Sequence, residues 1–431
     1  MRPVTIANIC FFGLWIWALL YCRKHSFDDP ASIFFNADIA YTTRYSAKRI
    51  EQADEFLRLH RLKHLAINVH LGPQPEPVSS ADKFLCIGIP SSSRPSDVYL
   101  ARTLATLVDN LTPQQRASIS IKVLLADREP SKHLAHHQKW LSDLVDEVLV
   151  YKSSANPDDE PAKYTTIHNI GDADRGDNMV QNTRVDSAVL VDACNTWGGK
   201  YTALIEDDVI ASPDWFKMLT KGVAHVQDRS QRLGYDWLYL RLFYTELFMR
   251  WTWEEFISSA QMIFVLYVVV FVIFLELRRR RRLQLERASD SDKLSSYHTS
   301  QTFNQISSMV IGLWIPALIV LYYVAGRMAI NRLTPFPLSG VRQMPKYGCC
   351  GQGLVVPQRQ VEGLATMLRT PPFDFAADQM VEIYADEKKL RKFALDQSVL
   401  QHVGPVSDAS PNKRVWNFGF ERRRDPAPTL S

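Results

Sequence analysis

The sequence YTALIEDDVI, residues 201–210, contains three consecutive carboxylates between two apolar runs: Glu206, Asp207 and Asp208. The run before them has the composition of a buried strand, so the carboxylates gather at its carboxyl end. Carboxylates this close repel one another and lose hydration when buried, and a divalent cation relieves both costs. Such a cation also suits a nucleotide diphosphate, because it bridges phosphate oxygens. The alternative is a solvated turn before a helix, since Ser212-Pro213 is a typical helix start.

Three charge-free apolar segments interrupt the 431-residue chain: Val4 to Cys22, Phe256 to Leu275, and Met309 to Gly326, which contains Pro316. At about 1.5 Å per residue each is long enough to cross a bilayer as a helix. The first segment could instead be a cleaved signal peptide, and the other two could be buried core helices. We expect an uncleaved anchor, because the residues from Tyr21 to Lys24 do not form a small-residue cleavage site.

Five consecutive arginines, Arg278 to Arg282, follow the second apolar segment. Such a run is typical of a cytosolic flank, so the second and third segments are predicted to form a hairpin with a cytosolic connection over 276–305. The N-terminus is then cytosolic, although Arg23 and Lys24 favour the opposite orientation. Residues 23–250 and 328–431 are expected in the lumen of the Golgi or endoplasmic reticulum. The net charge of +4 largely reflects this run and gives no case for nucleic-acid binding.

The segments outside the membrane alternate between strand and helix patterns. Strands are expected over 83–90, 119–126, 147–151, 201–205, 237–243 and 351–357, and helices over 96–110, 133–145, 178–196, 213–225, 358–369 and 375–395. A surface loop is expected over 152–175. This alternation predicts an α/β fold with a mostly parallel sheet, in which ligands gather at the carboxyl ends of strands.

The predicted hairpin divides one luminal domain into two parts. We expect an anchor over 1–22, a luminal stem with a helical segment over 23–79, the first part of the domain over 80–250, the hairpin over 256–326, and the remainder over 328–431. The last part alone would bury only a modest core, so it is expected to complete the sheet. Four cysteines would be luminal, where disulfides are permitted: Cys86, Cys194, Cys349 and Cys350. The adjacent Cys349 and Cys350 are expected to pair with separate distant partners.

Three motifs in this order resemble the nucleotide-sugar glycosyltransferases of the GT-A fold: the strand-Pro-Ser-Arg stretch from Ile89 to Arg94, the acidic triplet, and Gln401-His-Val-Gly404. Together with the membrane hairpin, they are similar to the post-GPI-attachment N-acetylgalactosamine transferase family of Golgi enzymes. The resemblance implies a GT-A-like, Rossmann-like domain with three transmembrane helices. It also implies inverting transfer of GalNAc from UDP-GalNAc to a mannose of the GPI-anchor glycan.

The resemblance assigns roles to individual residues. Asp208, Asp207 and His402 would bind a divalent metal, Mn²⁺, that holds the UDP-sugar diphosphate. Five residues would contact the nucleotide: Pro90, Ser91, Arg94, Glu206 and Asp207. Arg184 and Asp186, on the long helix before the triplet, are further candidates. From the residues alone, His402 could equally be a core histidine.

Inverting transfer needs a carboxylate base, for which Asp378 is our candidate, with Asp374 and Glu382 as rivals. A first-turn acid that stabilises its helix is the alternative interpretation of Asp378. The expected partners are a nucleotide sugar and a GPI-anchored protein or other lipid-linked glycan, at a multi-pass Golgi membrane or, alternatively, in the endoplasmic reticulum. Two other functions remain open. One is a GT-A transferase with a GlcNAc or mannose donor that acts on N-glycans or glycolipids. The other is a noncatalytic membrane scaffold or ion pathway, although a channel is disfavoured because the apolar segments lack mid-depth charges.

Overall fold

The computed structural model describes residues 3–66, 83–94, 98–127, 129–152, 163–167, 178–245, 251, 253–287, 290–326, 340–344, 351–404 and 417–424. The chain divides into two compact units. The first consists of Met1–Tyr41 and Glu246–Phe336, and the second of Thr42–Thr245 and Pro337–Ser431. The second unit is therefore interrupted in sequence by part of the first.

Long apolar helices build the first unit: α1 (Pro3–His25), α9 (Trp253–Arg287), α10 (Asp290–Met309) and α11 (Ile315–Ala325), with the short α2 (Ala37–Ala40). Three spans are long and apolar enough to cross a membrane: Val4–His25, Phe256–Glu286 and Thr299–Ala325. The three predicted membrane segments are thereby confirmed as candidate spanning helices. A π-helical turn over Val310–Trp314 precedes Pro316 and accommodates the missing backbone donor of the proline.

The connection between the second and third spans differs from the predicted loop over 276–305. The arginine run lies inside α9, which ends at Arg287, and α10 begins at Asp290. Helix continues because Glu276 pairs with Arg279 and Arg280, three and four residues later in the chain.

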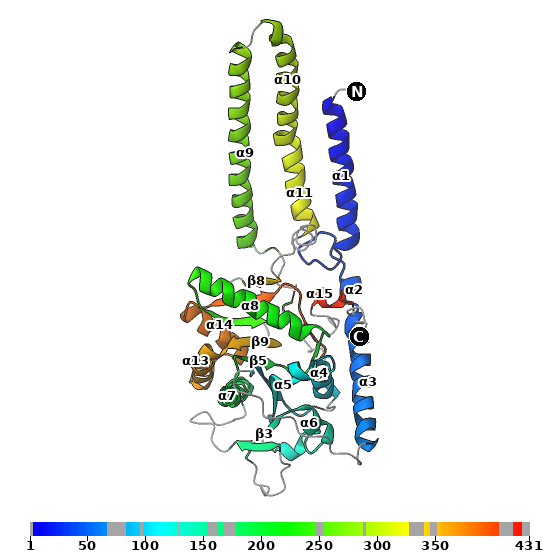
Figure 1. Ribbon diagram of the computed structural model, residues 1–431, viewed down its shortest axis with the longest axis vertical. Coiled ribbons are helices and arrows are strands. Elements are labelled where there is room, and N and C mark those ends of the chain that lie inside the picture. Colours follow the sequence, from blue (N-terminus) through cyan, green and yellow to red (C-terminus); the bar gives the residue numbers. More distant parts are fainter. Residues whose placement is uncertain are drawn as a thin grey trace. The chain divides into compact units, whose positions relative to one another are not determined.

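Helix α1 runs parallel to the α10–α11 pair. The Trp314 indole donates to Asn8 Oδ1 at 2.8 Å, and the Trp15 indole donates to the Ala317 carbonyl at 2.9 Å. Helix α9 runs antiparallel to α10. The N-terminal end of α1 therefore lies at the same end of this unit as the arginine run of α9 (Figure 1).

A nine-stranded sheet in the order β4-β3-β2-β1-β5-β9-β7-β10-β8 forms the centre of the second unit. Its strands are β1 (Leu85–Ser91), β2 (Ile119–Leu125), β3 (Glu147–Tyr151), β4 (Tyr164–Ile167), β5 (Tyr201–Ile205), β7 (Trp237–Arg241), β8 (Val341–Gln343), β9 (Gly353–Pro357) and β10 (Arg391–Leu395). The pairs from β4 to β5 are parallel, whereas β9 is antiparallel to both β5 and β7. The predicted mostly parallel α/β sheet is confirmed, and strands from after the hairpin belong to it.

The helices of the second unit include α3 (Tyr45–Ala66), α4 (Val98–Val108), α5 (Pro113–Ala117), α6 (Lys139–Leu144), α7 (Met179–Trp197), α8 (Trp215–Leu233), α13 (Gln358–Arg369), α14 (Ala377–Glu387) and α15 (Phe418–Glu421). Helix α7 packs on β1 and against α13 (Figure 1). A disulfide between Cys86 and Cys194 joins β1 to α7, with the Cα atoms 5.4 Å apart. Neither cysteine is therefore a partner for Cys349 or Cys350, which lie outside the described residues.

Three predicted elements need correction. The expected loop over 152–175 contains β4, and of the expected helix over 133–145 only α6 is an α-helix. The expected helix over 375–395 is α14 followed by β10. Helix α14 ends because Lys389 adopts a left-handed conformation with φ of 55°, after which buried Phe393 and Leu395 join the sheet.

Candidate active site

The acidic triplet forms the link between β5 and a short strand, β6 (Val209–Ala211). Strand β6 pairs antiparallel with β11 (Leu400–His402), with His402 opposite Val209. The backbone N–H of Val403 also donates to the Asp208 carbonyl at 2.9 Å. This pairing brings His402 beside Asp208, although they are far apart in sequence.

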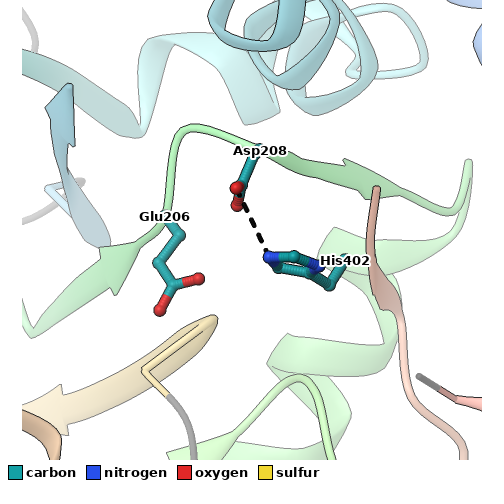
Figure 2. Close-up of side chains that lie close together, drawn as sticks. All are labelled: Glu206, Asp208 and His402. Carbon is teal, nitrogen blue, oxygen red and sulfur yellow. Dashed lines mark ion pairs between the residues drawn. The ribbon is translucent and has the colours of Figure 1, made fainter. Parts of the chain in front are cut away.

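One potential metal-binding group arises from this pairing. Ligand atoms of Glu206, Asp208 and His402 all lie within 4.8 Å of one another. His402 Nε2 is 3.3 Å from Asp208 Oδ2, and Figure 2 shows these two side chains pointing toward one another with Glu206 beside them. Two carboxylates and an imidazole offer the oxygen and nitrogen donors that divalent metal ions use in proteins.

Asp207 points to different partners. Its carboxylate accepts a hydrogen bond from Ser91 Oγ at 2.7 Å and pairs with Arg94 at 2.7 Å. The other end of the Arg94 guanidinium pairs with Asp208 Oδ2 at 2.9 Å. Arg94 therefore bridges two of the three carboxylates, and the flat fork of a guanidinium fits such a pair.

Burial is the largest influence on the pKa of each charged group here. Burial and, secondarily, Asp208 raise the pKa of Glu206 to about 7. Burial raises the pKa of Asp207 to about 6, despite Arg94 and Ser91. Burial also raises the pKa of Asp208, but His402 and Arg94 outweigh it, so the net shift is downward. Burial lowers the pKa of His402, yet its bond to Asp208 reverses that shift.

The immediate surroundings of Asp208 fit a cation. Its Oδ1 atom is buried and has no hydrogen-bond partner among the described residues. A Cβ atom on Gly404 would lie 2.1 Å from Asp208 Oδ2, so only glycine leaves room for this carboxylate. A Cβ on Gly351 would lie 3.2 Å from Glu206 Oε1, which is a milder clash. Excess buried carboxylate, an orphaned oxygen and close glycines together fit a divalent metal.

A pocket of about 400 Å³ opens over the triplet. Six of the predicted site residues line it: Pro90, Arg94, Glu206, Asp207, Asp208 and Asp378. Ser91 is only 3% exposed and reaches the pocket through its hydrogen bond to Asp207. His402 contacts Asp208, which lines the pocket. The structure therefore brings the three sequence motifs and the start of α14 to one place.

A comparison with protein families gives a match to "GPI-N-acetylgalactosamine transferase PGAP4" over residues 85–401, well over half of the chain. The chain belongs to the PGAP4 family. It is therefore a glycosyltransferase, whose family acts with a sugar donor on a GPI glycan, and its apolar helices fit a membrane-embedded enzyme. A search of curated proteins found no match.

Within this PGAP4-family chain, the two extra nucleotide candidates on α7 differ. The buried Arg184 guanidinium donates to four carbonyl groups at and after the end of α13: Met367, Leu368, Thr370 and Pro372. Arg184 therefore holds α13 and is not free to reach a nucleotide. Asp186 does line the pocket, and its carboxylate accepts a hydrogen bond from the Tyr151 hydroxyl at 2.6 Å.

The three candidate bases also differ. Asp378 lines the pocket, whereas Asp374 is exposed and outside the described lining. Glu382 accepts hydrogen bonds from the Tyr239 hydroxyl and Arg241, each at 2.6 Å, and pairs with Lys392 at 2.9 Å. Glu382 therefore anchors α14 of the PGAP4-family fold to the sheet and is not available for proton transfer.

Parts of this site could not be predicted from the sequence. Glu206 lies with Asp208 and His402 in the possible metal group, where Asp207 was the expected ligand. Gly351, Met179 and Thr183 also line the pocket. The only signal for them was position, since Gly351 precedes a strand and the other two begin the helix before the triplet.

Proposed function

We propose that this chain transfers GalNAc from UDP-GalNAc to a mannose of a GPI glycan, with inversion and with a divalent metal. The main support for this proposal is the group formed by Glu206, Asp208 and His402, which lies at a pocket that Asp378 also lines. A diphosphate bound at the triplet would leave its sugar facing into the pocket. The family match supports the acceptor and the sugar.

The triplet region is proposed to hold the donor diphosphate. Asp208, Glu206 and His402 would hold Mn²⁺, with Asp207 as a further oxygen ligand once Arg94 moves. The metal would stabilise the negative charge that develops on departing UDP. Arg94 would leave the carboxylates of Asp207 and Asp208 and bind phosphate oxygens, which a guanidinium contacts equally well with two parallel hydrogen bonds. Pro90 and Ser91 end β1 beside it, where ligands of α/β sheets commonly bind.

Asp378 is the proposed general base. Its carboxylate would take the proton of the acceptor hydroxyl as that oxygen forms a bond to C1 of GalNAc. The bond from C1 to the β-phosphate oxygen breaks, and its electron pair leaves with UDP. Attack from the side opposite the leaving group inverts the anomeric configuration. Glu382, one helical turn after Asp378, would keep α14 in place through Arg241 and Lys392.

Several features favour the lumen of the Golgi or the endoplasmic reticulum for the second unit. The disulfide between Cys86 and Cys194 suits an oxidising compartment. The arginine end of α9 lies at the same end of the first unit as the start of α1, which fits one cytosolic side for both. Because the hairpin interrupts the second unit in sequence, it would tether the pocket to the bilayer that holds a lipid-linked acceptor.

Substitution of the proposed ligands tests this function. Asp208→Asn should reduce GalNAc transfer by at least about a hundredfold, since it removes a negative charge that holds the metal, and the metal stabilises the transition state. Its Mn²⁺ affinity, followed by electron paramagnetic resonance, should fall in parallel. Asp374→Asn is the matched control, because Asp374 is an exposed carboxylate outside the pocket lining. Unchanged transfer and Mn²⁺ affinity in a folded Asp208→Asn protein would refute the metal role.

A further inference from the structure

A second cavity lies in the first unit and has no part in the sugar-transfer site. Its volume is about 650 Å³, it is open to the outside, and parts of α1, α9 and α10 form its walls. Its lining includes Val4 of α1, Arg282 and Leu285 of α9, and Asn304 and Met309 of α10. All three helices contribute near the point where their apolar spans end, so the cavity lies at the level expected for lipid headgroups.

Most of the side chains in the cavity wall are polar. Tyr297, Gln301, Asn304 and Ser308 lie on one face of α10, because they follow the spacing i, i+4, i+7 and i+11. Hydroxyl and amide groups on this face can donate to and accept from a ligand. Asn304 Oδ1 is buried and has no hydrogen-bond partner among the described residues, so a ligand hydroxyl would satisfy it.

The arginines of the run do not all have the same surroundings. Arg278 donates to Ser307 Oγ at 2.7 Å and Ser308 Oγ at 2.8 Å, and it thereby joins α9 to α10. Arg281 lies over the Phe303 ring at 4.0 Å from its centre. Arg282 lines the cavity, and it makes no ion pair with a carboxylate in the described part of the chain. Its guanidinium is therefore the charge that the cavity offers to a ligand.

We propose that this cavity binds the phosphorylated polyol headgroup of an anionic phospholipid from the adjacent leaflet. Arg282 would pair with the phosphate on the polyol, as guanidinium groups do in a fork. The polar face of α10 would bind polyol hydroxyls, and Val4, Leu285 and Met309 would contact the glycerol and upper acyl region. Basic pockets between membrane helices are suited to such headgroups. The proposal rests on the membrane helices and is independent of the sugar-transfer reaction.

The test compares lipids of equal total charge. Full-length protein would be placed in phosphatidylcholine nanodiscs that contain either phosphatidylinositol monophosphate or enough phosphatidylserine to match its charge. Lipid retained on the protein is then measured by native mass spectrometry. We expect the phosphoinositide to be retained about tenfold or more over phosphatidylserine, since a charge-assisted hydrogen bond changes binding by at least that factor.

Two variants and one control locate the effect. Arg282→Gln and Asn304→Leu should each remove most of this preference. Arg279→Gln is the matched control: its side chain is 76% exposed, pairs with Glu276 and does not line the cavity. It should weaken retention of both lipids alike and leave the preference intact. GalNAc transfer by the variants reports that they remain folded.

Two results would overturn the proposal. Equal losses of preference in Arg282→Gln and Arg279→Gln would show only diffuse attraction to the arginine run. Soluble inositol phosphate that binds as tightly as the lipid, with no gain from the acyl chains, would show a site for a free metabolite and not for a membrane lipid.

Discussion

Replacement of Gly404 by alanine tests whether the position of Asp208 governs catalysis. The added Cβ would lie 2.1 Å from Asp208 Oδ2, whereas real Cβ atoms essentially never approach within 3.0 Å. One of the two must therefore move by about 0.9 Å, the difference between these distances. Asp208 also contacts His402 and Arg94, so this shift disturbs both contacts.

The expected size of the effect follows from that displacement. A misplacement of about 1 Å at a reacting centre costs on the order of a hundredfold in rate. We therefore expect Gly404→Ala to lower kcat/KM for GalNAc transfer by about a hundredfold, or about 2.7 kcal/mol in the activation barrier. Mn²⁺ affinity should fall as well, since ligand distances tolerate only about 0.2 Å of error.

Gly351→Ala provides the graded control. Its Cβ would lie 3.2 Å from Glu206 Oε1, so the carboxylate needs to yield by only a few tenths of an ångström. We expect a loss of less than about tenfold, because the carboxylate has rotamer freedom to adapt. Both proteins should melt within a few degrees of wild type. Activity within about threefold of wild type for Gly404→Ala, or a larger loss for Gly351→Ala, would refute the reasoning.

Three further predictions concern the base, the anchor of α14 and the disulfide. Asp378→Asn should lower kcat by about 10²–10⁴-fold with unchanged Mn²⁺ affinity, whereas Asp374→Asn should retain activity; equal effects would exclude Asp378 as the base. Burial raises the pKa of Glu382, but its basic partners and a tyrosine outweigh this and hold the pKa below 4.5. Its contribution to stability is then complete above about pH 4.5 and is lost as the pH falls through the folded pKa, so the melting-temperature deficit of Glu382→Gln should shrink below pH 4.5. The double variant Cys86→Ala/Cys194→Ala opens a link across a separation of 108 residues and should lose about 2–5 kcal/mol in denaturant unfolding; an unchanged midpoint would contradict a structural role.

Much of the fold was predictable because local patterns determine it. The run from Tyr201 to Ile205 has the apolar composition of a buried strand and is β5 within the same bounds, and the arginine run marks the end of a membrane helix. Strand β10 was not predictable from period alone. Its five residues could equally continue the preceding helix by one more turn. They form a strand because they pair with β7 and β8.

The site was predictable in its parts and not in its assembly. The apolar run before the acidic triplet predicted that carboxylates lie at the end of β5. Nothing in the local sequence indicates that His402 lies beside Asp208. That contact depends on pairing between β6 and β11, which lie about 190 residues apart in the chain. The family resemblance likewise assigned a metal role to Asp207 and not to Glu206. Which carboxylate faces His402 and which faces Ser91 is decided by the turn between β5 and β6.

Donor profiling of the purified full-length protein tests whether it is a metal-dependent UDP-GalNAc transferase. The protein would receive each of several UDP and GDP sugars together with a GPI glycan acceptor, with and without Mn²⁺, and the product would be analysed for the sugar added and its anomeric configuration. We expect transfer from UDP-GalNAc, dependent on Mn²⁺ and with inversion at C1. Transfer from a GDP sugar in preference to every UDP sugar, or full activity in the presence of a strong chelator, would contradict it.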